Sequence, residues 1–188
     1  MTKHKNKPIF KLSLSSIFIA LATALSMIKI YELPLGGSVT LLSMLPIIML
    51  SAMLGLKWGL GSAFVYSLIQ LILGIALDGV LGWGLTPLSL VGTILLDYIV
   101  PFTLLGFGGI FAKKGTLGLM LSTALVIVLR FLCHFTSGAI IFDIWCSWDN
   151  AWLYSLCYNG SYMLPELVIT LIGAAFTFNA PQIKKQII

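Results

Sequence analysis

Four ionisable side chains interrupt stretches of the sequence that are otherwise apolar, and they are the residues best suited to chemistry. They are Asp97, Arg130, His134 and Glu166. An ionisable group is costly in a hydrocarbon environment, so it normally faces a cavity or pairs with another polar group. Arg130 and His134 are four residues apart, which places them on one face of a helix. The four residues therefore indicate a polar site inside an apolar bundle.

Their types predict two different roles. We expect Arg130 and Glu166 to stabilise the bundle, with Arg130 paired to Glu166 or Asp97, and neither to contact a ligand. Asp97, with Tyr98 next to it, is a candidate ligand contact. His134 either contacts a ligand or forms a hydrogen bond with a neighbouring helix, and its spacing favours neither interpretation.

The composition places these residues in a membrane protein. Of the 188 residues, 59% are hydrophobic and 9% are charged, against roughly 25% charged in a soluble domain. Six apolar runs approach or exceed the ~20 residues that cross a bilayer as a helix. They cover residues 12–28, 39–54, 60–77, 87–112, 117–142 and 152–178. The sequence predicts an all-α integral membrane protein of six helices, in a single membrane domain over residues 1–188.

Lysines indicate how these helices are oriented. They precede the first run, follow the sixth, and lie between the second and third and between the fourth and fifth runs. By the positive-inside rule these segments are cytoplasmic, so we expect both termini inside and the chain in the cell (plasma) membrane. The lysines concerned are Lys3, Lys5, Lys7, Lys11, Lys57, Lys113, Lys114, Lys184 and Lys185.

A cleaved signal peptide is the competing interpretation of the N-terminal segment. The basic start, the apolar stretch and Ala22-Thr23-Ala24 resemble such a peptide with its cleavage site. Cleavage would leave five spans and break the even alternation of basic segments, so we favour six spans.

The three connections expected on the outer side, residues 31–38, 78–86 and 143–151, contain acids but neither Lys nor Arg, and tryptophans lie in or beside them. Carboxylates and aromatic faces together suit a planar cationic solute. An ordinary interfacial aromatic belt would have the same composition, so the connections alone leave both interpretations open. The residues are Glu32, Asp78, Asp143, Asp149, Trp83, Trp145, Trp148 and Trp152.

Polar residues of three runs lie at a similar depth. Asp97 is ten residues into the fourth run and His134 about eight residues from the end of the fifth. At 1.5 Å per residue, both lie roughly 12–15 Å below the outer surface. Tyr154 and Asn159 enter the sixth run from the same side. We therefore expect these residues and Tyr98 to converge on one outward-facing pocket.

Motifs of the common enzyme classes are absent from the sequence. It has neither a GxxxxGK[ST] phosphate-binding loop nor an HExxH zinc motif. Three irregularly spaced cysteines predict neither a disulfide framework nor a zinc site. We expect no enzymatic activity, no metal, no cofactor and no nucleic-acid binding, and any transport must draw its energy from a source other than ATP bound by such a loop in this chain.

Small residues recur every fourth position in the first run, at Ser16, Ala20 and Ala24. Such a stripe lets another helix approach closely. It serves either internal packing or docking of another subunit, and the sequence alone favours neither.

Four segments, in this order, carry a resemblance to a known family. They are Leu35 to Leu41 (LGGSVTL), Leu96-Asp97-Tyr98, Arg130 to Gly138 (RFLCHFTSG) and Tyr154 to Tyr162 (YSLCYNGSY). Over nearly the whole chain, they resemble the thiamine-specific S-components of energy-coupling factor (ECF) transporters, the ThiT family.

The resemblance implies a six-helix protein that captures thiamine from outside and has no ATPase of its own. It would dock, through the stripe of Ser16, Ala20 and Ala24, on a transmembrane coupling subunit that carries two ATPase subunits. A pyrimidine-stacking aromatic is implied at Phe142 or Trp145. Asp97 stands where the best-known members have Glu. The implied substrate-binding residues are Asp97, Tyr98, His134, Phe142, Trp145, Tyr154 and Asn159.

Three other functions remain open. The chain could be an S-component for another vitamin. It could be a proton-coupled secondary transporter of an aromatic cation, with Asp97, His134 and Glu166 as a proton relay. It could also be an assembly subunit that uses the small-residue stripe and binds no small molecule.

Overall fold

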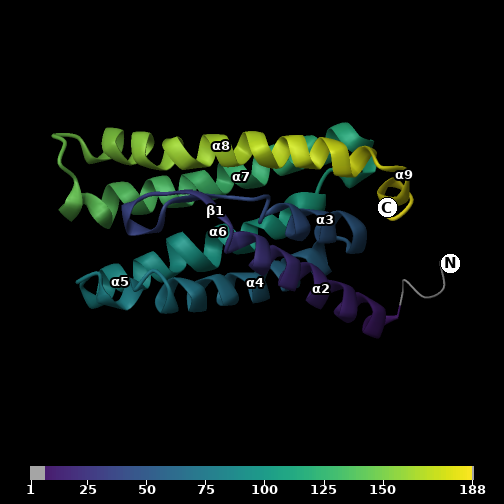
Figure 1. The fold of residues 1–188 in the computed structure, drawn as a ribbon, viewed down its shortest axis with the longest axis horizontal. Coiled ribbons are helices and arrows are strands. Elements are labelled where there is room, and N and C mark those ends of the chain that lie inside the picture. Colours follow the sequence, from purple (N-terminus) through teal and green to yellow (C-terminus); the bar gives the residue numbers. More distant parts are fainter. Residues whose placement is uncertain (1–6, 188) are drawn as a thin grey trace.

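The computed structural model describes residues 7–187 and consists of long helices that run roughly along one direction (Figure 1). Five helical stretches are long and apolar enough to cross a membrane, and Leu45–Leu54 is a shorter apolar helix. The helices are α2 (Pro8–Ser26), α3 (Leu45–Leu54), α4 (Leu56–Ala76), α5 (Pro87–Thr93), α6 (Val100–Leu104), α7 (Gly115–Ile140), α8 (Ala151–Asn179) and α9 (Pro181–Lys184).

The fourth predicted span is one helical stretch built from several kinds of turn. Helix α5 continues through a π-helical segment, Ile94–Ile99, into α6 and then a 3₁₀ segment, Leu105–Gly109. π-Helical turns are rare and occur frequently at functional sites. Asp97 and Tyr98 lie in the π-helical segment.

The second predicted span, residues 39–54, differs from expectation, because helix α3 begins only at Leu45. Residues 39 and 40 belong instead to strand β2 (Ser38–Thr40), which pairs antiparallel with β1 (Lys29–Glu32). Non-helical backbone at membrane depth is tolerated where it is buried in protein or lines a cavity. The hairpin meets that condition because Gly36, Gly37, Ser38 and Thr40 line the pocket described below.

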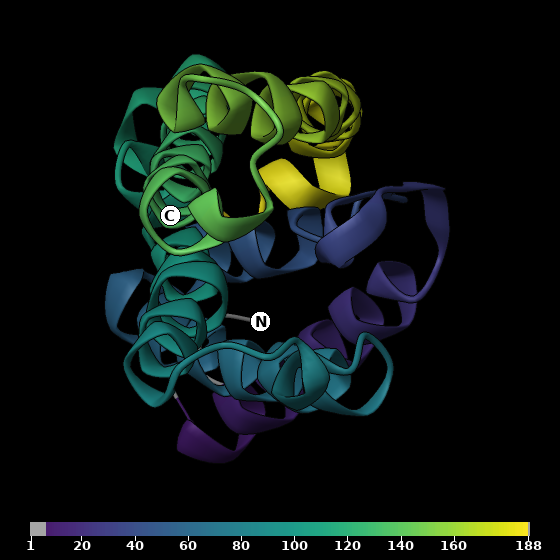
Figure 2. The same cartoon turned by 90° about the vertical axis from the view of Figure 1, so that its left-hand side faces the viewer.

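The hairpin lies in the half of the molecule away from the start of α2 and from α9, which share one end (Figure 1). From the opposite end, α7, α8, the fourth span, α4 and the hairpin surround a central region (Figure 2). The described lysines of the predicted cytoplasmic segments belong to or adjoin the starts of α2, α4 and α7 and helix α9, and these parts lie toward the same end of the molecule (Figure 1). Lys3 and Lys5 lie outside the described residues.

Close packing at this end depends on a buried hydroxyl and on glycines. Ser51 Oγ donates a hydrogen bond to the carbonyl of Gly106 (2.5 Å) and accepts one from the N–H of Gly109 (3.0 Å). Gly59 of α4 faces the same point, where a Cβ atom would lie 2.5 Å from Ser51 Oγ and 2.7 Å from the Gly106 carbonyl oxygen. Only glycine at position 59 allows these elements to approach so closely.

Gly59→Ala is therefore expected to destabilise the protein, whereas Gly61→Ala on the same helix is not. Replacing glycine by alanine favours a helix by about 1 kcal/mol at either position. Only Gly59→Ala also creates a clash, which costs about 1–3 kcal/mol. At Gly61 nothing lies within 4 Å of an added Cβ atom. Thermal unfolding in detergent should show Gly59→Ala melting roughly 2–12 °C below Gly61→Ala. Equal melting temperatures would contradict the packing described here.

Candidate binding pocket

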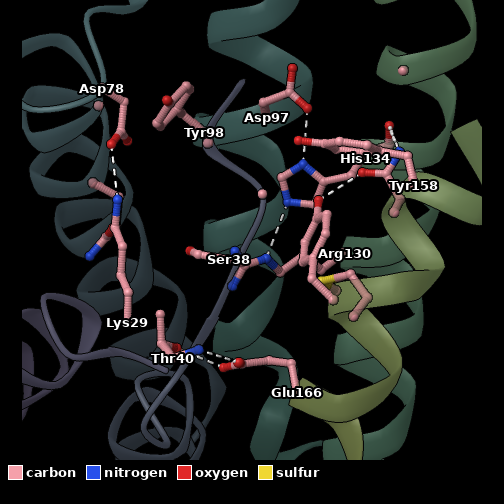
Figure 3. Close-up of a pocket in the computed structure, with 18 of the residues that line it drawn as sticks. Lys29, Ser38, Thr40, Asp78, Asp97, Tyr98, Arg130, His134, Tyr158 and Glu166 are labelled. Carbon is pink, nitrogen blue, oxygen red and sulfur yellow. Dashed lines mark hydrogen bonds and ion pairs between the residues drawn. The ribbon is translucent and has the colours of Figure 1, made fainter. Parts of the chain in front are cut away.

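A cavity of about 210 Å³ opens among α4, the fourth span, α7, α8 and the hairpin (Figure 3). One water needs only about 10–15 Å³, so the space suits a small organic solute. Every residue predicted to bind a ligand lines it, although the residues come from separate elements. They are Asp97, Tyr98, His134, Phe142, Trp145, Tyr154 and Asn159.

Asp97 and His134 form the polar centre of the pocket (Figure 3). His134 Nδ1 lies 2.9 Å from Asp97 Oδ1, and Ser137 Oγ donates to Asp97 Oδ2 at 2.5 Å. Arg130 Nε donates to His134 Nε2 at 3.2 Å. Because Nε2 accepts this bond, the proton of the neutral imidazole resides on Nδ1 and is donated to Asp97. The carboxylate is thus fixed in orientation, while each oxygen keeps a lone pair for a ligand.

The predicted pairing of Arg130 with Glu166 or Asp97 is wrong for the described part of the chain. The Arg130 guanidinium lies over the ring of Phe102, 4.1 Å from its centroid. Glu166 accepts hydrogen bonds from the backbone N–H and the hydroxyl of Thr40, at 2.7 and 2.8 Å. The sequence interpretation missed this contact because it placed Thr40 at the start of a helix, whereas the strand β2 carries Thr40 against Glu166 of α8. Both charged residues also line the cavity.

Asn159 connects α7 to α8. Its Nδ2 donates to the carbonyls of His134 (3.3 Å) and Ser155 (3.0 Å), and its Oδ1 accepts from the Tyr162 hydroxyl at 2.7 Å. Gly138 makes the approach possible, since a Cβ there would lie 2.9 Å from Asn159 Nδ2. Little hydrogen-bonding capacity is left, so Asn159 acts mainly by positioning His134.

Three tyrosines line the pocket from α8, one on each successive turn. Tyr158 lies between Tyr154 and Tyr162, with ring centroids 6.1 and 6.0 Å away. The Tyr158 hydroxyl donates to the carbonyl of Pro34 and so ties the hairpin to α8. Tyr158 and Tyr162 were not among the predicted binding residues, although their four-residue spacing from Tyr154 is a signal that the sequence contains.

A second aromatic group lies between two of the connecting segments. Phe142 contacts both Trp83 and Trp145, with ring centroids 5.8 and 5.5 Å away. All three side chains line the cavity. The two candidates for a stacking aromatic, Phe142 and Trp145, are therefore parts of one cluster, and Trp83 joins them.

Lys29 of β1 is a further charged residue that lines the pocket. Its Nζ lies 2.6 Å from Glu32 and 3.0 Å from Asp78, and so it links β1 to the end of α4. Burial lowers the pKa of Lys29, but hydrogen bonds and charge attraction from Glu32 and Asp78 outweigh it and raise the pKa above the usual 10.5. Lys29 is therefore a cation at neutral pH.

The small-residue stripe lies outside the pocket. Ser16, Ala20 and Ala24 are all exposed on α2. Internal packing, one of the two interpretations of the stripe, is therefore not its role within this chain.

Comparisons with known proteins agree with this architecture. A family model described as thiamine transporter protein matches residues 12–185. The thiamine transporter ThiT of Bacillus subtilis (strain 168) is 31% identical, over 97% of each chain. The solved structure of ThiT from Listeria monocytogenes superposes with a TM-score of 0.75 at 20% identity, covering 95% of this chain and 98% of that one.

The structural match confirms the predicted all-α membrane fold, to which the hairpin is a small addition. The family resemblance seen in the four sequence segments is also confirmed, because the family model and the Bacillus subtilis relative both match nearly the whole chain. The chain therefore belongs to the thiamine transporter protein family, whose role is membrane transport and not catalysis.

Proposed function

We propose that this chain is the thiamine-binding S-component of an ECF-type uptake transporter, and that the cavity described above is its thiamine site. One observation carries the proposal: seven residues predicted from the sequence line a single cavity whose centre is the Asp97–His134 pair. The Bacillus subtilis relative is named a thiamine transporter, which supports thiamine over other vitamins.

The ligand's aminopyrimidine suits the polar centre. Asp97 is held by His134 and Ser137, which leaves lone pairs on both carboxylate oxygens to accept N–H bonds from the amino group of the aminopyrimidine. Hydrogen bonds to a charged group contribute about 1.5–3 kcal/mol each. Tyr98 lines the cavity from the same π-helical segment.

The permanently charged thiazolium suits the remainder of the pocket. In their ionised forms, the acids that line the pocket outnumber the bases, since Asp78, Asp97 and Glu166 face Lys29 and Arg130. His134 adds no charge, because its Nε2 atom accepts a hydrogen bond and the ring is therefore neutral. A cation is therefore attracted more than an anion. The rings of the tyrosine stripe and of the Phe142 cluster add cation–π attraction and stacking area.

A proton-coupled carrier is less well supported. Its relay would need Asp97, His134 and Glu166 in one hydrogen-bonded chain. Among the described residues, Glu166 is bonded to Thr40, while Asp97 and His134 are bonded to each other and to Ser137 and Arg130. Within the described part of the chain, no hydrogen bond joins the two groups.

Transport would then use an external energy source. We propose that the exposed stripe of Ser16, Ala20 and Ala24 docks on a transmembrane coupling subunit that carries two ATPase subunits. In this arrangement the chain is a single membrane domain of the plasma membrane. The lysine-rich end, with both termini, is cytoplasmic, and the pocket faces outward.

Asp97→Asn is expected to weaken thiamine binding about 10- to 100-fold, because the neutral amide loses the charge and presents N–H donors where the ligand also donates. Isothermal titration calorimetry of the purified protein measures the change. Asp149→Asn is the matched control, since Asp149 is an exposed acid outside the cavity. Its affinity should stay within about twofold of wild type. Unchanged affinity in Asp97→Asn would remove Asp97 from the site.

Ala20→Trp is expected to abolish uptake by the assembled transporter and to leave thiamine binding unchanged, because the bulky ring blocks a close helix contact. Uptake of labelled thiamine into proteoliposomes and binding in detergent are measured on the same preparation. Leu121→Trp, at an exposed position of α7, is the control and should retain uptake. Loss of binding in Ala20→Trp, or normal uptake, would contradict docking through the stripe.

A further inference from the structure

A second concave site lies between α2 and α4, at the lysine-rich end and apart from the binding pocket. From α2 it is lined by Leu12, Ser15, Ser16 and Ile19, and from α4 by Lys57, Trp58, Gly61, Ser62 and Val65. On α2, positions 12, 15 and 19 are spaced three or four residues apart and therefore share one helix face. Positions 58, 61, 62 and 65 share a face of α4 in the same way, so each helix contributes one wall of the site. Helix α2 runs obliquely to the other long helices (Figure 1).

The groove has an apolar body and a basic entrance. Leu12 and Val65 are exposed within its walls, and Gly61 leaves open space, with nothing within 4 Å of a Cβ. The residues from 12 to 19 rise roughly 10 Å along α2, about the depth of the upper acyl chain region. Lysines lie at the helix ends: Lys57 lines the groove, and Lys11 Nζ lies 5.9 Å from the centroid of the Trp58 ring.

We propose that this groove binds one anionic phospholipid, with an acyl chain between α2 and α4 and the phosphate between Lys11 and Lys57. Basic pockets between transmembrane helices on the cytoplasmic side bind acidic lipid headgroups, and a nearby lysine is worth about 1 kcal/mol at an anionic surface. Trp58 sits at the first turn of α4, the headgroup level that tryptophan prefers. The charge of the entrance selects an acidic lipid over a neutral one.

The docking stripe shares only Ser16 with the groove, so lipid binding does not occupy the exposed face at Ala20 and Ala24.

Native mass spectrometry of the full chain, released from nanodiscs, tests the proposal. Discs of phosphatidylglycerol should yield protein retaining one lipid, and discs of phosphatidylcholine should yield at least tenfold less of that adduct. Lys11→Glu with Lys57→Glu should reduce phosphatidylglycerol retention at least tenfold. Lys113→Glu with Lys114→Glu is the matched control, because both lysines are exposed at the same end and outside the groove. It should retain the lipid.

A steric variant distinguishes the groove from general charge attraction. Gly61→Phe fills the groove without changing charge, and it should lose the lipid as well. Circular dichroism melting checks that each variant is folded. If Gly61→Phe is misfolded, it is replaced by Val65→Trp, which also narrows the groove. Equal retention of both lipids, equal loss in both lysine pairs, or full retention in folded Gly61→Phe would overturn the proposal. Full retention would leave the groove to a helix of a partner subunit.

Discussion

The cost of placing polar groups in hydrocarbon governs the arrangement of this protein. Asp97, Arg130, His134 and Glu166 lie in apolar helices, and each has a polar or aromatic partner inside the bundle. These partners come from different elements, so satisfying each group also fixes the position of a helix or of the hairpin. The same residues line the cavity. The requirement that makes the bundle stable in lipid therefore also assembles a polar binding site within it.

The hairpin is the part of the fold in which this requirement is most visible. Non-helical backbone could not face lipid, but the hairpin forms a wall of the cavity instead. Three contacts attach it to the helices: Thr40 to Glu166, Pro34 to Tyr158, and Lys29 to Asp78. Thr40 donates two hydrogen bonds to Glu166, Pro34 accepts one from Tyr158, and the ion pair of Lys29 with Asp78 is partly accessible to solvent.

Hydropathy and charge predicted most of the fold, because long apolar helices leave a strong signal in the sequence. The predicted binding residues share a cavity because depth along a helix follows from a rise of 1.5 Å per residue. The hairpin was missed because residues 39–40 directly precede an apolar run, and only their pairing with β1 makes them extended. Arg130 was assigned the wrong partner because an ion pair is the simplest expectation from composition, although its four-residue spacing from His134 already allowed a hydrogen bond between the two side chains.

Binding of thiamine to the central cavity is tested most directly by titrating the detergent-purified protein with thiamine and following tryptophan fluorescence. Two of the five tryptophans, Trp83 and Trp145, line the cavity, so a bound ring should quench part of the emission. We predict saturable quenching by thiamine, none by biotin, and a smaller amplitude in the double variant Trp83→Phe, Trp145→Phe. No quenching, together with no heat of binding by calorimetry, would contradict a thiamine site in this cavity.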